Sequence, residues 1–207
     1  LSADGNPEFA IIMKVMLLNT ATGLMFGIPE VCHPLKFTPM TSLSHLPTPA
    51  ALVDVKRMMR NIARMQARAA ALGVKLRPHV KTTKCRDIAE AQVAAGAQGI
   101  TVSTLKEAEQ FFACGLTDIL YAVGMVPAKL PQVLALRRRG CDLKIITDNL
   151  ASAQAIAAFC IEHQEKLEVW IEIDTDGHRS GVKPEDELLL QIGHALRSEE
   201  HTSELQS

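Results

Sequence analysis

The chain has 207 residues, of which 47% are hydrophobic and 22% are charged, and its formal net charge is -1 at pH 7. This composition is that of an ordinary globular protein with enough apolar side chains for a sizeable core. The near-neutral charge argues against a nucleic-acid partner, which calls for a basic patch, and the 4% aromatic content disfavours a stacking platform for single strands.

Residues 1–45 form a leader for which the sequence predicts no native fold. The apolar run over residues 11–28 is interrupted by polar side chains and falls short of a membrane span, so we expect no membrane association. A short signal peptide starting at Met13 is one alternative. We prefer the hypothesis that Met40 is the true start and that residues 1–39 are translated upstream sequence.

The cysteines show no C-x-x-C pair and no cluster with histidine. They are therefore expected to be free thiols in a reducing compartment, here the cytoplasm, and not a disulfide framework or a zinc site. The five are Cys32, Cys85, Cys114, Cys141 and Cys160.

From residue 48 onward, strand and helix patterns alternate. A short apolar strand at 51–53 precedes a helix whose apolar face, with Met58, Met59 and Met65, we expect in the core. Thr104 and Glu107 predict a capping box at a later helix start. Further strands are predicted at 75–81, 99–103, 118–122, 143–147 and 167–174, and further helices at 87–95, 104–114, 127–140, from Asp148 or Asn149 to 163, and from 184 onward.

These patterns give five successive strand–helix units, as expected for parallel strands joined by helical crossovers. Two α/β architectures fit them: a doubly wound open sheet and a (β/α)8 barrel. No strand is followed by G-x-G-x-x-G, which weakens the dinucleotide-binding alternative. A complete barrel has eight units, of which this chain supplies about five.

The stretch from Arg77 to Lys84, Arg-Pro-His-Val-Lys-Thr-Thr-Lys, places Lys81 at the end of a predicted strand. An amine in a desolvated pocket attacks carbonyl groups, so such a lysine is typical of a Schiff-base cofactor site. The alternative is a surface lysine just beyond a strand. His79 falls on the same strand face and is either close to a cofactor or an interior histidine with its hydrogen bonds satisfied.

This stretch resembles the lysine motif of D-threonine aldolases and D-serine dehydratases. These are pyridoxal 5'-phosphate (PLP) enzymes of fold type III, built on the alanine racemase N-terminal domain. The resemblance implies a partial (β/α)8 TIM barrel over residues 46–196, without the C-terminal β-domain, and implies that Lys81 carries PLP. Thr83 stands where many members have histidine.

A second stretch, Asp174 to Gly181, resembles the family motif D-x-G-x-x-R-x-G, with Asp176 in place of a small residue. The family's arginine hydrogen-bonds the phenolic oxygen of the cofactor, which implies that role for Arg179. The alternative is that Asp174 and Arg179 pair with each other and brace the loop.

The resemblance implies a PLP-dependent lyase that acts on D-3-hydroxy amino acids, of the D-threonine aldolase type. The alternatives are a D-serine dehydratase, an amino-acid racemase, or a non-catalytic PLP carrier. It also implies a homodimer and a divalent metal, manganese or zinc, whose ligands lie beyond Leu196, so no metal ligand is assigned within the chain.

Residues 197–207 match the translation of a sequencing adapter and carry no apolar periodicity. A natural polar tail is the alternative. We expect that this segment is an artefact and that the native sequence of a longer protein is interrupted near Leu196.

Overall fold

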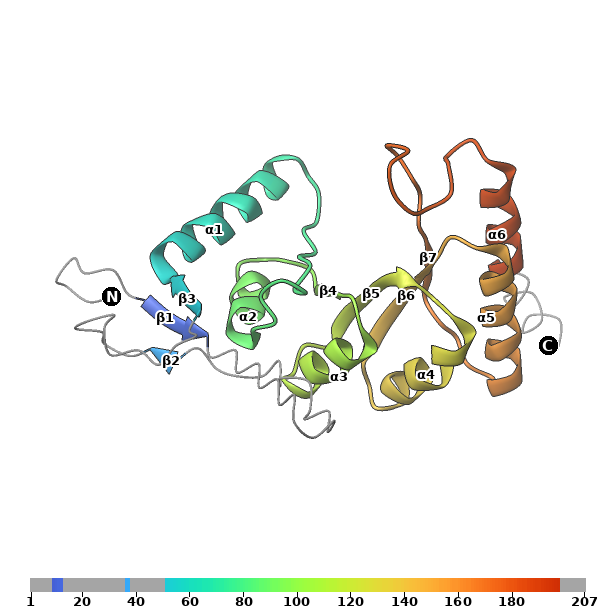
Figure 1. Ribbon diagram of the computed structural model, residues 1–207, viewed down its shortest axis with the longest axis horizontal. Coiled ribbons are helices and arrows are strands. Elements are labelled where there is room, and N and C mark those ends of the chain that lie inside the picture. The colour runs from blue at the N-terminus through green and yellow to red at the C-terminus, as the bar shows by residue number, and fades with distance from the viewer. Residues whose placement is uncertain (1–8, 13–35, 38–50, 198–207) are drawn as a thin grey trace, which may run out of the picture. The chain divides into compact units, whose positions relative to one another are not determined.

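The computed structural model describes residues 9–12, 36–37 and 51–197, which divide into two compact units (Figure 1). The first unit comprises residues 1–100 with 110–116, and the second comprises residues 101–109 with 117–207. The predicted leader, apart from two short strands, and the predicted adapter segment, apart from Arg197, lie outside the described residues.

The first unit contains a small antiparallel sheet and two helices. Its strand order is β2-β1-β3, with Ile11 of β1 opposite Leu52 of β3. The long helix starts where the side chain of Asp54 accepts a hydrogen bond from the Arg57 amide at 2.9 Å. The elements are β1 (Phe9–Ile12), β2 (Lys36–Phe37), β3 (Ala51–Asp54), α1 (Val55–Ala71) and α2 (Arg86–Ala94).

The apolar face of α1 is less buried than its periodicity predicts. Met58 is half-buried and packs against the pair Cys85 and Ile88, but Met59 and Met65 are 46% and 56% exposed. The expectation that the methionine face forms core is therefore wrong for these two residues. Amphipathic spacing defines which face is apolar, whereas burial depends on whether another element covers that face.

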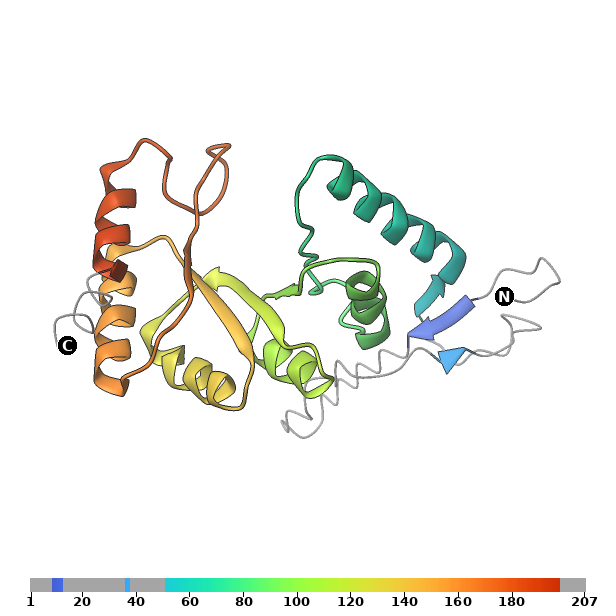
Figure 2. The ribbon, with the colours of Figure 1, turned by 180° about the vertical axis from the view of Figure 1, so that it is seen from behind.

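The second unit is a four-stranded sheet in the order β4-β5-β6-β7, in which β5, β6 and β7 pair in parallel (Figures 1 and 2). This confirms an α/β fold with a parallel sheet. A helix follows each strand, as the alternation of patterns predicts. The elements are β4 (Ile100–Val102), α3 (Leu105–Ala113), β5 (Asp118–Gly124), the 3-10 helix η2 (Pro127–Lys129), α4 (Leu130–Arg138), β6 (Asp142–Thr147), α5 (Leu150–His163), β7 (Val169–Ile171) and α6 (Glu187–Arg197).

Burial in β6 is typical of a sheet that is covered on both faces. Successive side chains of a strand point to opposite faces, yet every residue from Leu143 to Thr147 is buried. Helices α5 and α6 lie side by side (Figures 1 and 2) and enclose a cluster of Ala153, Val182 and Ile192.

Two predicted helix caps are present. Thr104 Oγ1 accepts a hydrogen bond from the Glu107 amide at 3.0 Å, and the Glu107 carboxylate accepts one from the Ser103 amide at 2.9 Å. Between the two residues proposed to cap α5, the structure selects Asn149, whose side chain accepts from the Ser152 amide at 3.0 Å. Asp148 therefore has its carboxylate free for another contact.

The strand predicted over residues 75–81 is not formed, so the sheet has four of the five expected strands. The segment has a single bridge position, at His79, and the Gln98 amide donates a 2.7 Å hydrogen bond to the Leu76 carbonyl. Pro78 has no amide hydrogen to donate to a ladder, which explains why strand pairing does not extend along the segment.

Smaller differences occur at element ends. The helix expected from Pro127 begins as the 3-10 turn η2, and the helix expected from Pro184 begins at Glu187. The last strand is shorter than predicted, although an isolated bridge joins Ile173 to Val182.

The cysteines differ from expectation at one position. Cys85, Cys141 and Cys160 are free and buried, but Cys114 is disulfide-bonded. The prediction of free thiols is therefore wrong for Cys114, because short spacing motifs cannot exclude a pairing between cysteines far apart in the sequence. Among the helices of the described residues, none has the length and hydropathy that crossing a membrane requires.

Candidate active site

Lys81 lies in a tight turn between two buried anchors of the first unit. Val80 is 1% exposed and Cys85 is 2% exposed, and the Lys84 amide closes the turn with a 2.9 Å hydrogen bond to the Val80 carbonyl. The Lys81 side chain itself is exposed, and within the described residues its ammonium has no hydrogen-bond or ion-pair partner. The turn therefore presents an accessible amine on a well-anchored backbone.

The backbone next to this lysine is strained. Lys84 has a φ of 45°, and apart from glycine only Gln164 shares a positive φ among the described residues. The His79 ring accepts a hydrogen bond from the Lys81 amide at 3.3 Å, through Nδ1, and the residue is exposed. His79 thus orders the turn locally, and its prediction as an interior histidine is wrong.

Arg179 lies in the second unit, in the loop that follows β7. Its side chain is exposed and makes no hydrogen bond or ion pair with the described residues. Asp174, which the sequence offered as its partner, instead accepts hydrogen bonds from the Gly177 amide at 2.9 Å and the Asp176 amide at 3.4 Å. Asp174 and Arg179 therefore do not pair with each other, and an ion pair between them does not brace this loop.

The loop is closed at its base by backbone hydrogen bonds. The Asp174 amide donates to the Val182 carbonyl, and the Val182 amide donates to the Glu172 carbonyl, both at 2.9 Å. Ser180 Oγ adds a 3.0 Å hydrogen bond to Glu172. The guanidinium of Arg179 is thus carried by a loop whose backbone is fixed at both ends.

A carboxylate from the neighbouring strand also reaches this loop. Asp148 directly follows β6, and its Oδ2 accepts a 3.2 Å hydrogen bond from the Gly181 amide. Since β6 and β7 are parallel neighbours, both groups lie at the edge of the sheet where strands end, the edge that carries active sites in barrels. Sequence reasoning considered Asp148 only as a helix cap and missed this contact.

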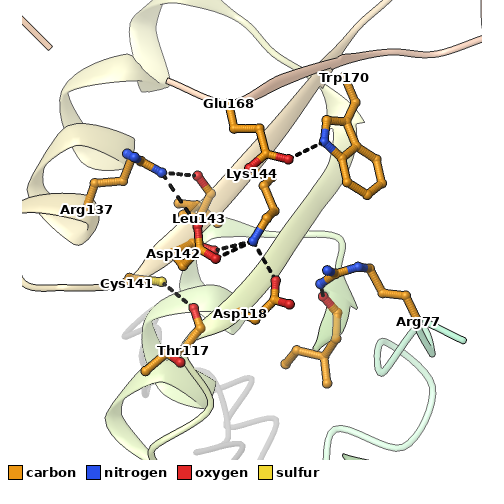
Figure 3. A network of polar contacts seen from close by, with 11 residues as sticks. Arg77, Thr117, Asp118, Arg137, Cys141, Asp142, Leu143, Lys144, Glu168 and Trp170 are labelled. Atoms are coloured by element: carbon orange, nitrogen blue, oxygen red, sulfur yellow. Dashed lines mark hydrogen bonds and ion pairs between the residues drawn. The ribbon is translucent and has the colours of Figure 1, made fainter. Parts of the chain in front are cut away.

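The opposite edge of the same sheet holds a cluster of charges (Figure 3). The Lys144 ammonium, with its side chain 8% exposed, donates to Asp118 at 2.7 Å and also to the Asp142 carboxylate. Burial alone would lower the pKa of Lys144, but its hydrogen bonds to the two carboxylates outweigh burial and raise that pKa. These three charges satisfy one another where strands begin, the edge that in barrels serves stability.

A cavity of about 300 Å³ lies elsewhere in the first unit, and neither Lys81 nor Arg179 lines it. It carries two amide oxygens, on Gln66 and Gln92, that have no hydrogen-bond partner in the part of the chain that the structure describes. The cavity is lined by Asn61, Ile62, Met65, Gln66, Leu76, Pro78 and Gln92.

The chemistry of the two predicted residues fits PLP. An exposed primary amine suits the cofactor's aldehyde, and an exposed guanidinium suits its phenolic oxygen. Lys81 and Arg179 belong to different units. Within the described part of the chain, histidine, cysteine and acidic side chains form no group of three or more that could hold a metal ion.

Comparison with known proteins decides the family. The model of the alanine racemase N-terminal domain matches residues 53–205. The chain belongs to this family. The resemblance noted in the two motifs is thereby confirmed, and with it a partial alanine racemase-type barrel and a family that uses PLP.

Among curated proteins, the chain is 69% identical over 156 residues to the D-threo-3-hydroxyaspartate dehydratase of Delftia sp. (strain HT23). It is 34% identical over 151 residues to the D-serine dehydratase of Dictyostelium discoideum and 32% identical over 160 residues to the D-threonine aldolase of Arthrobacter sp. These matches cover 75%, 69% and 77% of this chain, but only 41%, 38% and 42% of the relatives.

Solved structures agree with these matches. The Delftia dehydratase superposes with a TM-score of 0.73 at 68% identity, over 75% of this chain and 41% of its own. The D-threonine aldolase from Filomicrobium marinum superposes with a TM-score of 0.66 at 31% identity, over 74% of this chain and 41% of its own. The chain thus spans about two fifths of the length of the relatives that it matches.

Proposed function

We propose that this chain is part of a PLP-dependent dehydratase, an ammonia-lyase, that acts on D-3-hydroxy amino acids of the 3-hydroxyaspartate kind. The observation that carries the proposal is the 69% identity to the Delftia dehydratase over 156 residues. The reaction removes the Cα proton and the 3-hydroxyl group as water, and hydrolysis of the product then yields a 2-oxo acid and ammonia.

The sequence motifs alone placed the aldolase first, and the comparisons favour the dehydratase. Identity to the Arthrobacter aldolase is 32%, less than half of that to the Delftia enzyme. Both reactions begin from the same substrate class and differ in the bond broken at Cα. The likeness to alanine racemase structures, at 17% identity, supports the fold alone.

Lys81 would bind the cofactor covalently through its amine. When bound, PLP withdraws electrons from the Cα atom of an attached amino acid, which weakens the bonds at that atom. The exposed side chain of Lys81 can receive and release the cofactor, while the anchors Val80 and Cys85 hold the backbone in place.

Arg179 would donate a charge-assisted hydrogen bond to the phenolic oxygen of the cofactor. The guanidinium, which has no partner among the described residues, and the loop that fixes its backbone support this role. A positive charge here favours the ionised form of that oxygen.

We use 'full-length protein' for a chain that contains these residues and is as long as the curated relatives. For this full-length protein we also propose a divalent metal and a homodimer. A mutant of the Delftia dehydratase has been solved in a metal-free form, which supports the metal. Manganese and zinc are the candidates, and their role would be to hold the substrate hydroxyl.

Borohydride trapping tests the role of Lys81 in the full-length protein. With PLP present, reduction should attach the cofactor to Lys81, and Lys81→Ala should abolish the label. Lys84→Ala is the matched control, because Lys84 lies in the same turn and should leave labelling intact. A label on Lys84 in the unmutated protein would overturn the assignment.

Substrate choice tests the reaction. The purified protein should release ammonia from D-threo-3-hydroxyaspartate faster than it releases an aldehyde from D-threonine. Faster release of the aldehyde would contradict the dehydratase proposal and favour the aldolase reaction.

Arg179→Leu tests the second residue. The variant should fold normally and bind PLP about tenfold more weakly or worse, since a hydrogen bond to a charged group contributes about 1.5–3 kcal/mol. Unchanged affinity and turnover would leave Arg179 without a role in the site.

A further inference from the structure

The contact between Asp148 and Gly181 joins the Arg179 loop to a strand other than its own. Asp148 Oδ2 accepts the Gly181 amide hydrogen at 3.2 Å, across a separation of 33 residues. The first turn of α5 does not need this carboxylate, because the Asn149 side chain caps the start of the helix. The Asp148 carboxylate is therefore available for the contact with the loop.

Gly181 is a position where the loop backbone has little freedom. Its φ is +118°, and a Cβ atom there would lie 2.6 Å from the Asp174 amide nitrogen and 2.8 Å from the Ile173 carbonyl carbon. The returning strand of the loop thus passes directly over its outgoing strand. The hydrogen bond to Asp148 fixes the peptide at this crossing, two residues after Arg179.

The other oxygen of the carboxylate faces the end of β5. A Cβ atom on Gly124 would lie 3.7 Å from Asp148 Oδ1, an ordinary contact. The pairing of β5 with β6 shifts register between Tyr121 and Gly124, which places Gly124 opposite Ile146. Asp148 therefore lies between the ends of two neighbouring elements, with a glycine on each side.

We propose that Asp148 is a positioning residue for the cofactor, acting through Gly181 on the direction of Arg179. The proposal rests on the proposed function, since it concerns the arginine that would bind the phenolic oxygen. Hydrogen bonds at the base of the loop fix residues 172, 174 and 182, and Ser180 Oγ donates to Glu172 at 3.0 Å within the loop. Asp148 is the contact that joins this part of the loop to the end of β6. Loss of this tie lets Arg179 move while the fold persists, and a misplacement of about 1 Å can cost about 100-fold in rate.

The test uses Asp148→Ala and Asp148→Asn in the full-length protein loaded with PLP. Arg179 favours the ionised phenolic oxygen, so its displacement should raise the pH midpoint at which the bound cofactor changes its absorbance spectrum. Asp148→Ala should raise the midpoint in the same direction as Arg179→Leu and weaken PLP binding about tenfold. Asp148→Asn keeps an acceptor oxygen and should restore most of both properties.

A double variant separates positioning from a general loss of order. If Asp148 acts through Arg179, then Asp148→Ala combined with Arg179→Leu should show the midpoint of Arg179→Leu alone. Additive shifts would overturn the proposal. Asp176→Ala is the matched control, because Asp176 accepts a hydrogen bond within the same loop, from the His178 amide at 3.2 Å, and should leave the midpoint unchanged.

Hydrogen exchange of the protein without PLP provides a readout that does not depend on the proposed function. The Gly181 amide should exchange at least about tenfold faster in Asp148→Ala than in the unmutated protein, and at the same rate in Arg179→Leu. No acceleration would overturn the hydrogen bond itself. Faster exchange with an unchanged spectral midpoint would overturn the positioning role, whereas failure of borohydride labelling at Lys81 would count against the proposed function and leave the exchange result standing.

Discussion

The amide nitrogen of Asp174 lies 2.6 Å from the place that a Cβ atom on Gly181 would occupy. No side chain fits this gap without moving backbone atoms. Gly181→Ala should therefore destabilise the protein by about 1–3 kcal/mol, measured by urea unfolding, and should weaken PLP binding.

Gly177→Ala is the matched control for this prediction. Gly177 also has a positive φ, +72°, but a Cβ atom there meets nothing within 4 Å. Its cost should not exceed about 1–2 kcal/mol, the penalty of the left-handed backbone alone. Equal effects of the two substitutions would show that the crossing at Gly181 is not tight.

Lys144→Met should remove the cation from the cluster at the beginning of the strands. Asp118 and Asp142 would then lose the ammonium that lies between them, while Asp142 would keep the Arg137 guanidinium at 4.0 Å. Because Asp142 is 55% exposed and partly screened by water, we expect a loss of about 2 kcal/mol, less than the 3–5 kcal/mol of a fully buried pair. Chemical denaturation at pH 7 measures it.

The matched control for Lys144 is Lys106→Met. Lys106 pairs with Glu109 at 2.9 Å, but both side chains are well exposed, at 47% and 38%. Its substitution should change stability by no more than about 1 kcal/mol. A similar loss in both variants would mean that burial does not strengthen the Lys144 cluster.

Because of Cys141, the free energy of unfolding should decrease as the pH rises into the alkaline range. Burial, with a smaller contribution from the Asp142 charge, raises the pKa of this thiol from 9.0 to about 11. The folded state binds the thiol proton more tightly than the unfolded state. The contribution of this proton to the free energy of unfolding is therefore fully present below pH 9 and is lost as the pH rises from 9 to about 11. The loss should amount to about 2 kcal/mol and be absent in Cys141→Ala, as unfolding measured across this pH range will show. Equal pH dependence in both proteins would contradict the prediction.

Gln164→Gly should stabilise the protein. Gln164 ends α5 with φ 52° and ψ 44°, a left-handed conformation that glycine adopts without steric penalty. We expect a gain of about 1 kcal/mol in the free energy of unfolding. Gln154→Gly, in the exposed interior of the same helix, should lose about 1 kcal/mol instead, so a loss in both variants would refute the argument.

Much of the fold follows from local chemistry that the sequence displays. The capping pair Thr104 and Glu107 fixes where a helix starts, and the apolar runs of β5 and β6 fix which strands are buried on both faces. Such signals involve residues a few positions apart, so one sequence is enough to interpret them.

The differences arise from a proline inside one predicted strand and from residues that lie far apart in the sequence. The strand predicted over 75–81 needed donors and acceptors along its length, and Pro78 supplies no amide hydrogen. The exposure of Met59 and Met65 depends on what covers α1, and Cys114 forms a disulfide that no spacing motif indicates. The exposure of the methionines and the disulfide cannot be inferred from local pattern, whereas the effect of Pro78 follows from its position inside the segment.

The candidate site divides in the same way. Lys81 and Arg179 were found through motifs that resemble those of a family, and no residue-level argument alone distinguished Lys81 from a surface lysine. The contact of Asp148 with Gly181 joins residues 33 positions apart, and only the parallel pairing of β6 and β7 brings them together.

Strand β6 begins with Asp142 and is followed at once by Asp148, so one six-residue strand carries the charge cluster at one end and the loop contact at the other. Substitutions at the two ends should therefore combine nearly independently in their effect on stability. A mutant library confined to Asp148 and residues 174–181 can therefore change the loop that carries Arg179 without touching the ion cluster.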